Sequence, residues 1–368
     1  MKKREMSLLL VVMLVSVFTA CGGADKVGYE IALVTDKGNI DDKSFNQGSW
    51  EGVLAFAKAN DITHQYYKPE EASDEGYLNA ISLAVDGGAK VVVCPGYLFE
   101  VAVYNAQTMF PDVKFILLDG EPHTPDFRYK TESNVACIKY AEEEAGYLAG
   151  YAAVMEGMRT LGFEGGMAVP AVIAFGQGYL QGIEAAATEL GLDDGSVKVF
   201  YHYTGDFAET DANKATAKAM FESGAEIIFG CGGSVGKSVF SAAAEANGKT
   251  IGVDVNQKAD SDTVITSAMK GLGASVQAVL ASIYDGSFDG TYGGKTTYFA
   301  AVNGGVSLPD DYERFTSFTK EQYDAAFAKL VDGTVDPIRS FEIADAAQVT
   351  ADQLQKELGL QKVVVEIR

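Results

Sequence analysis

Histidine and cysteine are scarce in this sequence, with three and four copies among 368 residues. The histidines are too far apart for any pair to have the spacing of metal ligands, at positions 64, 123 and 202. No two cysteines form a CxxC pair, and an odd number, three, follows the first twenty-one residues. These three occupy apolar or glycine-rich segments and are predicted to be small buried side chains: Cys94, Cys137 and Cys231. The sequence favours neither a metal site nor a disulfide framework.

Positive charge is also in short supply. The chain has 29 lysine and arginine residues against 51 aspartate and glutamate residues, a formal charge of −22. Removing residues 1–20 takes away three basic residues and one acidic residue, which moves the charge to −24. A surface this negative repels nucleic acid and anionic lipid headgroups. It also disfavours phosphorylated ligands, unless a local basic site binds them.

The N-terminus has the layout of a secretory signal. Basic residues 2–4 precede an apolar run, 8–18, that is shorter than the roughly 20 residues of a membrane-spanning helix. Small residues then lead to Cys21, followed by two glycines. This junction resembles the bacterial lipobox, whose cysteine is acylated and becomes the new N-terminus, although Phe18 stands where that motif usually has leucine.

These features predict a signal peptide at residues 1–20, lipidation of Cys21 and a tether over 21–28. Several acyl chains anchor a protein stably, whereas one chain holds it only marginally. We therefore expect a protein anchored by lipid to the extracytoplasmic face of the cell membrane. The alternative is an ordinary secretory signal with an incidental cysteine.

Short apolar segments alternate with longer helical patterns in the rest of the chain. The predicted strands are 29–35, 89–94, 114–118, 160–165, 197–203, 226–229 and 250–253. The predicted helices are 50–60, 101–110, 140–158, 172–190, 212–223 and 237–246, and glycine-rich residues 286–295 are predicted to be a loop. This alternation predicts an α/β fold with parallel sheets covered by helices on both faces. More than four βα units precede residue 255, which favours two successive doubly wound lobes.

Polar or glycine residues repeatedly follow the predicted strands. Asp36, Asp119 and Asp254 each come directly or almost directly after an apolar strand, and so do glycines at 230–233. Ligands of open α/β sheets bind at the carboxyl ends of the strands. The repeated placement therefore predicts a ligand cleft at these ends.

Seven blocks of sequence share a pattern with a known family, at 33–38, 41–48, 110–119, 134–150, 162–175, 251–254 and 266–270. In this order they resemble the basic membrane protein family, the lipoproteins that bind purine nucleosides for ABC transporters. Ile40-Asp41 and Ala174 depart from the usual family pattern, and residues 338–368 extend past the matched part.

The resemblance implies a type I periplasmic-binding-protein fold, in which a three-stranded hinge joins two Rossmann-like lobes. Lobe 1 would comprise residues 29–138 and about 255–295, and lobe 2 would comprise 139–254 and about 296–368. It further implies capture of a purine nucleoside, such as inosine, guanosine or adenosine, for delivery to an ABC permease.

Four residues of the family pattern would bind the purine base. Phe45 and Phe175 correspond to two aromatic rings that sandwich it, and stacking contributes about 1–3 kcal/mol per base. Asn46 and Asp119 would bind the base edge. Because ionised aspartate only accepts hydrogen bonds, it would favour a base with an N1–H donor, as in inosine and guanosine. Without the resemblance, the two phenylalanines would be interpreted as core residues and Asn46 as a helix cap.

Four further residues would surround the ribose. Asp36 and Asp254 would accept hydrogen bonds from its hydroxyls, with Lys270 as donor and counter-charge. Gly232 would let the backbone approach the sugar. Carboxylates around the sugar leave little room for phosphate, which predicts nucleosides as ligands in preference to nucleotides.

The sequence also contains partial patterns of other functions. Residues 231–238 approach the GxxxxGK[ST] phosphate-loop pattern, but Cys231 replaces its first glycine. Asp36, Asp41 and Asp42 lack the rest of a metal shell for hydrolysis, so we expect a binding protein, neither an enzyme nor a cofactor carrier. The remaining alternatives are a binding protein for a sugar or a signalling furanone, or a sensory receptor subunit.

Overall fold

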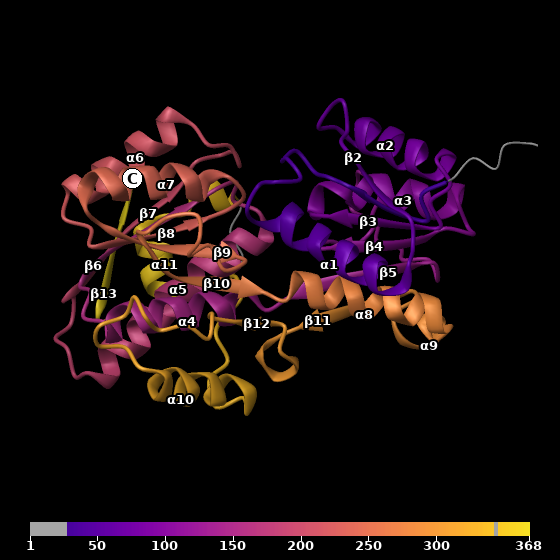
Figure 1. The fold of residues 1–368 in the computed structure, drawn as a ribbon. Helices are drawn as coiled ribbons and strands as arrows, with labels where there is room; N and C mark the ends of the chain where they lie inside the picture. Colours follow the sequence, from indigo (N-terminus) through magenta and orange to yellow (C-terminus); the bar gives the residue numbers. More distant parts are fainter. Residues whose placement is uncertain (1–27, 342–344) are drawn as a thin grey trace, which may run out of the picture.

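The computed structural model describes residues 28–341 and 345–368, which form two lobes (Figure 1). The predicted signal peptide, the lipidation site Cys21 and nearly all of the predicted tether lie outside the described residues. Among the described helices, none is long and apolar enough to cross a membrane.

The first lobe is built on a six-stranded sheet in which all strand pairs are parallel. In sheet order the strands are β11 (Lys295–Phe299), β5 (Val135–Tyr140), β4 (Lys114–Leu118), β3 (Val91–Pro95), β1 (Ile31–Val34) and β2 (His64–Tyr67). Its helices are α1 (Phe45–Asn60), α2 (Asp74–Asp86), η1 (Tyr97–Phe99), α3 (Glu100–Met109), α8 (Leu272–Asp285) and α9 (Phe288–Thr291).

Helices cover both faces of this sheet. Ile31 and Leu33 of β1 pack into the core shared with α1, while Ala32 and Val34 pack against α2 and α3. Because side chains alternate across a strand and both faces are covered, β1 is apolar at every position.

The second lobe contains a seven-stranded sheet. In sheet order its strands are β12 (Val306–Ser307), β10 (Val264–Lys270), β9 (Lys249–Asp254), β8 (Ile227–Cys231), β6 (Thr160–Gly165), β7 (Val197–Tyr203) and β13 (Val363–Ile367). Only β12 among these is antiparallel to its neighbour. The helices of this part are α4 (Glu142–Met155), α5 (Pro170–Glu189), α6 (Asp211–Glu222), α7 (Val235–Ala246), η2 (Ala301–Asn303), α10 (Lys320–Val331), η3 (Ala346–Gln348) and α11 (Ala351–Glu357).

The two sheets repeat one strand order. The order β2-β1-β3-β4-β5-β11 in the first sheet corresponds to β7-β6-β8-β9-β10-β12 in the second. The chain passes between the lobes three times, from β5 to α4, from β10 to α8 and from β11 to η2. The order reverses between β1 and β3 and between β6 and β8, which are the points where doubly wound sheets bind ligands.

Some local predictions differ from the structure. Helix α1 begins at Phe45 and not at residue 50, and the predicted loop 286–295 contains the short helix α9. Residues 255–295 were expected in lobe 1, but β10 pairs with β9 in the second sheet. We propose that the chain returns to the first lobe only after β10, where α8 packs beside α1.

Candidate functional site

A cleft lies between the lobes, at the carboxyl ends of the strands. Its empty volume is about 750 Å³, including space open to solvent, which is in the usual range for small-molecule sites. All eight residues predicted to bind ligand line this cleft: Asp36, Phe45, Asn46, Asp119, Phe175, Gly232, Asp254 and Lys270. The topology brings these eight residues together from both lobes, and their roles toward a ligand stay predictions.

A hydrogen-bond network holds Asp36 on the first-lobe wall. Asp36 Oδ1 accepts from the Gly38 amide at 2.7 Å and from Asn46 Nδ2 at 2.7 Å. Asn46 Nδ2 also donates to Asp42 Oδ2 at 3.0 Å, and Asn46 Oδ1 accepts from the Asp36 amide at 3.2 Å. Both amide hydrogens of Asn46 are therefore committed within the protein. This geometry indicates that Asn46 orients Asp36. It does not favour the predicted role of Asn46, which is to bind the edge of the base.

Burial changes the protonation of Asp36. Desolvation raises the pKa of its carboxyl to about 6, although hydrogen bonds from Asn46 and Gly38 oppose the shift. Asp36 is therefore ionised at neutral pH but protonates in mild acid.

Lys270 lies at the centre of the site, with its side chain only 2% exposed. Its ammonium lies 2.6 Å from Asp119 Oδ2 and 3.0 Å from Glu142 Oε1. Burial disfavours the charge, but the carboxylates of Asp119, Glu142 and Asp254 raise the pKa of Lys270 overall. Burial also raises the pKa values of Asp119 and Asp254 above their usual range. One ammonium is thus shared by several carboxylates.

Two site carboxylates sit on unusual backbone. Asp119, just after β4, has φ +57°, and Asp254, at the end of β9, has φ +65°. L-residues rarely adopt this left-handed region, although aspartate tolerates it better than most, and such conformations cluster at functional sites. Asp254 Oδ2 accepts a hydrogen bond from Ser44 Oγ, which joins the second lobe to the first across the cleft.

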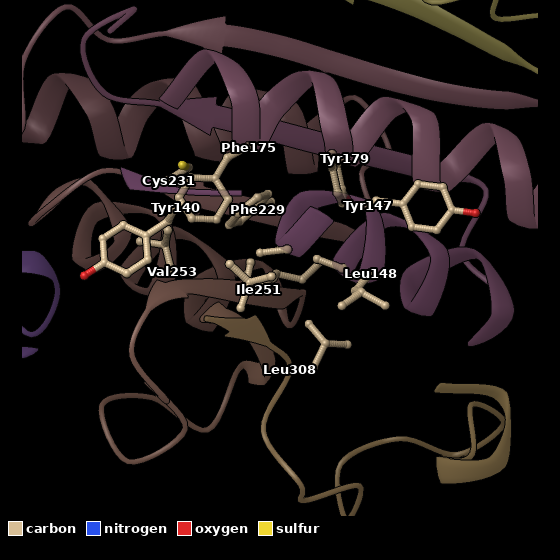
Figure 2. Packing of buried hydrophobic residues seen from close by; sticks show 14 of the residues in the cluster. Tyr140, Tyr147, Leu148, Phe175, Tyr179, Phe229, Cys231, Ile251, Val253 and Leu308 are labelled. Carbon is tan, nitrogen blue, oxygen red and sulfur yellow. The ribbon is translucent and has the colours of Figure 1, made fainter. Parts of the chain in front are cut away.

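The two predicted stacking rings come from opposite lobes. Phe45 is the first residue of α1. Phe175 belongs to α5, and its ring lies beside Cys231 and Phe229 (Figure 2). The Lys270 ammonium lies 4.8 Å from the Phe45 ring centroid and 5.3 Å from that of Phe175. Because one ammonium contacts both rings, both belong to the same small site.

The glycine-rich segment after β8 lines the cleft as backbone. Gly232 has φ +131°, and a Cβ there would lie 3.1 Å from the Phe207 ring. The resemblance to a phosphate loop does not extend to the side chains, because Ser238 Oγ exchanges hydrogen bonds with the backbone of Thr210. Lys237 is not among the residues that line the cleft.

Sequence reasoning missed several residues of the site. Phe207 and Tyr97 add aromatic surface to the cleft. Phe207 follows β7 and Tyr97 follows β3. The same argument that predicted the aspartates, that residues after strands line the cleft, could have predicted them. Glu142 and Arg339 lie behind Lys270 and form an ion pair of 2.5 Å with each other. Neither carries a local sequence signal.

Two further features of the described residues concern metal-ligating side chains and cysteines. Within residues 28–341 and 345–368, no group of three or more histidine, cysteine or carboxylate side chains is arranged to hold a metal ion. The predicted buried cysteines are confirmed, because Cys94, Cys137 and Cys231 are all buried and free.

Residues 30–336 match the family described as ABC transporter substrate-binding protein PnrA-like, or Bmp. The chain belongs to this family. The ABC transporter nucleoside-binding protein BmpA of Lactococcus lactis is 29% identical, with 91% of this chain and 99% of that protein covered. Basic membrane protein A of Borreliella burgdorferi is 27% identical over 88% of this chain and 93% of its own length. A lipoprotein of Pyrococcus abyssi is 28% identical, with coverage of 91% and 84%.

Solved structures identify the fold of this Bmp-family protein. A solute-binding protein of an ABC transporter system from Aeropyrum pernix matches with a TM-score of 0.76 at 20% identity, covering 90% of this chain and 99% of that one. The Lac repressor bound to ONPG matches with a TM-score of 0.54 at 13% identity, covering 78% and 82%. The predicted type I periplasmic-binding-protein fold with two parallel sheets is confirmed.

Family membership decides the broad function. The protein is a solute-binding component of an ABC transporter and not an enzyme. Relatives named basic membrane protein and lipoprotein are consistent with a membrane-associated, extracytoplasmic location.

Proposed function

We propose that this protein captures purine nucleosides between its lobes and delivers them to an ABC permease. The observation that carries the proposal is the pairing of Phe45 and Phe175, one from each lobe, around a single buried ammonium. We infer that each ring stacks on one face of the base, and each such contact contributes about 1–3 kcal/mol. The nucleoside-binding relative in Lactococcus lactis supports this ligand class.

The charges in the cleft favour a neutral ligand. Asp36, Asp42, Asp119 and Asp254 line it, whereas Lys270 is the one cation among the lining residues. Acceptors on this wall suit ribose hydroxyls, while a phosphate would meet like charge, which costs several kcal/mol. We therefore infer that nucleosides bind in preference to nucleotides.

Asp119 supports a preference among bases. Its Oδ2 pairs with Lys270, while its Oδ1 is buried without a hydrogen-bond partner among the described residues. A buried acceptor without a partner costs roughly 1–3 kcal/mol, so a ligand that donates to it gains affinity. The N1–H of inosine or guanosine is such a donor, and neutral adenosine lacks it.

Calorimetric titration of the mature protein, refolded after removal of bound ligand, tests the proposal. We expect inosine to bind at least about tenfold more tightly than its monophosphate, because of the carboxylate wall. Phe45→Ala should weaken inosine binding by about 5- to 150-fold, which corresponds to the loss of one stacking contact. Phe127→Ala serves as the control, since Phe127 is 69% exposed on the same lobe. Equal affinities for inosine and its monophosphate would refute the proposed ligand class.

We also propose that acylated Cys21 anchors the protein beside its permease. The lipoprotein relative and the signal-like N-terminus support this anchor. Replacement of Cys21 by serine should move the protein from the membrane fraction to the soluble fraction, and unchanged membrane recovery would contradict the anchor.

A further inference from the structure

Residues 337–368, hereafter the C-terminal segment, lie beyond the part of the chain that matches the family. We propose that Arg339 of this segment is a positioning residue of the ligand site, acting on Lys270 through Glu142. The inference rests on the proposed function for its ligand. It assigns part of the site to a segment that the family match does not cover.

Glu142 links the two cations. It is the first residue of α4, and its side chain is only 1% exposed. Glu142 Oε1 lies 3.0 Å from the ammonium of Lys270, while Oε2 lies 2.5 Å from Nη2 of Arg339. Each carboxylate oxygen thus faces a different cation. Lys270 in turn lies 2.6 Å from Asp119 Oδ2 on the cleft wall.

Arg339 is itself held in one orientation. Its Nη1 donates to the Tyr140 carbonyl at 2.7 Å and to Glu143 Oε2 at 2.6 Å. Gln181 on α5 fixes the preceding residue, because its amide group both donates to and accepts from the backbone of Ile338 at 2.8 Å. Tyr140 ends β5, where the chain crosses from one lobe to the other. The Arg339 guanidinium is therefore bound to the backbone at this crossing, and these hydrogen bonds hold it in place beside Glu142.

The charges explain why Lys270 depends on this arrangement. Burial alone would favour protonation of Glu142, but Lys270 and Arg339 together hold the pKa of its carboxyl below the usual range. A buried charge that loses one partner is strongly destabilised. Without Arg339, Glu142 would rely on Lys270 alone and draw the ammonium toward itself. Lys270 would then move away from Asp119 and the two aromatic rings.

A double-mutant cycle separates this positioning role from a general structural role. Inosine affinity is measured by calorimetry for wild type, Arg339→Gln, Glu142→Gln and the double variant. We expect Arg339→Gln to weaken binding about tenfold in the wild-type background, and to change it less than about threefold in the Glu142→Gln background. An equal loss in both backgrounds would show that Arg339 does not act through Glu142 and would overturn the proposal. If Arg339→Gln does not fold, Arg339→Met, which also removes the cation, replaces it in the same cycle.

Lys362→Gln is the matched control. Lys362 lies in the same C-terminal segment, and its side chain pairs with an exposed aspartate, Asp194. Removing this cation should leave inosine affinity unchanged. A loss as large as that of Arg339→Gln would point to the segment as a whole and would contradict a specific role of Arg339.

A second readout needs no ligand, so failure of the proposed function can be distinguished from failure of this inference. In protein labelled with ¹⁵N-lysine, the Nζ resonance of Lys270 is identified by its loss in Lys270→Met. Arg339→Gln should shift this resonance, and Lys362→Gln should not. An unshifted resonance overturns the inference even if inosine binds. If the resonance shifts but the protein does not bind inosine, the positioning of Lys270 by Arg339 is supported and only the proposed nucleoside ligand is refuted.

Discussion

At the scale of single residues, the buried carboxylates of the site contrast with one elsewhere in the core. In the site, Asp36 has an amide partner, Asp254 a hydroxyl partner and Glu142 two cations. Glu164 in β6 is also fully buried, but both of its oxygens lack a partner among the described residues. Burial raises the pKa of Glu164 to about 8. Its side chain is therefore neutral in the folded protein at physiological pH.

Glu164→Gln should stabilise the protein in a pH-dependent manner. The unfolded carboxyl titrates near its model value of 4.5, and the folded one near 8. A raised folded pKa contributes stability below pH 4.5 that is lost as the pH rises to about 8. Glutamine keeps the shape without titrating, so the variant should exceed wild type by about 2 kcal/mol or more in unfolding free energy at pH 8, and match it near pH 4.5. Urea denaturation at both pH values measures this difference.

Glu222→Gln is the control for this prediction, because Glu222 is exposed on α6. It should change the unfolding free energy by less than about 0.5 kcal/mol, as substitutions at exposed sites usually do. The opposite trend for Glu164→Gln, with its largest gain at acid pH, would show that Glu164 has an unrecognised partner in the folded protein.

At the scale of elements, a tightly packed helix pair carries Phe175, one of the two predicted stacking rings. Helices α4 and α5 approach at glycines spaced four residues apart: Gly146 and Gly150, and Gly178 and Gly182. A Cβ on Gly182 would lie 1.9 Å from the Tyr147 carbonyl oxygen, which real structures do not allow. This contact fixes α5, and with it the direction in which Phe175 points.

Gly182→Ala should force the two helices apart. Overpacking of this kind costs about 1–3 kcal/mol in unfolding free energy, although alanine is the better helix former. The shift should also displace Phe175 and weaken inosine binding. Thermal unfolding and calorimetry measure both effects. Gly290→Ala is the control, since a Cβ on Gly290 of α9 would meet no atom within 4 Å. Equal stability of the two variants would show that α4 and α5 can separate without cost.

The same elements show which parts of the fold the sequence predicts. Strands β4, β6 and β7 have the predicted bounds, because runs of buried apolar residues between turns leave little ambiguity. Strand β2 was not predicted, since as a partly buried edge strand it lacks such a run. Helix α1 starts earlier than the pattern predicts because Phe45 is followed by polar residues and glycine, of which Asn46 and Ser49 are buried by tertiary packing. Tertiary contacts determine strand β2 and the start of α1, so the local sequence pattern could not predict them.

At the scale of the whole molecule, the chain crosses three times between two similar sheets, and residues at the carboxyl ends of strands from both sheets line the cleft. Residues that follow strands converge there by topology, so their positions after strands and the family resemblance together predicted eight of the lining residues. Glu142 is different, because acidic residues in a first helical turn are ordinary complements of the helix dipole. Arg339 lies 199 residues beyond its partner Tyr140. No local pattern could predict a contact over that distance.

The contacts between the lobes predict how closure contributes to affinity. Ser44 Oγ of the first lobe donates to Asp254 Oδ2 of the second, and the same hydroxyl makes no capping bond to α1. Gln257 adds a second link, because its Nε2 donates to the Lys43 carbonyl at 2.7 Å. Ser44→Ala therefore removes one bond between the lobes and leaves the helix intact.

We expect Ser44→Ala to weaken inosine binding by about tenfold, in keeping with the roughly 1.5–3 kcal/mol of a hydrogen bond to a charged group. Most of the loss should appear as faster dissociation, because affinity differences between related complexes lie mostly in the dissociation rate and this bond joins the two lobes around the cleft. Stopped-flow measurements give the rates, and calorimetry gives the affinity. Ser49→Ala on the same helix is the control, since Ser49 Oγ donates within α1 to the Phe45 carbonyl. Similar dissociation rates for the two variants would mean that the Ser44 bond is not part of ligand-bound closure, whereas a loss confined to Ser44→Ala would link affinity to the contact between the lobes.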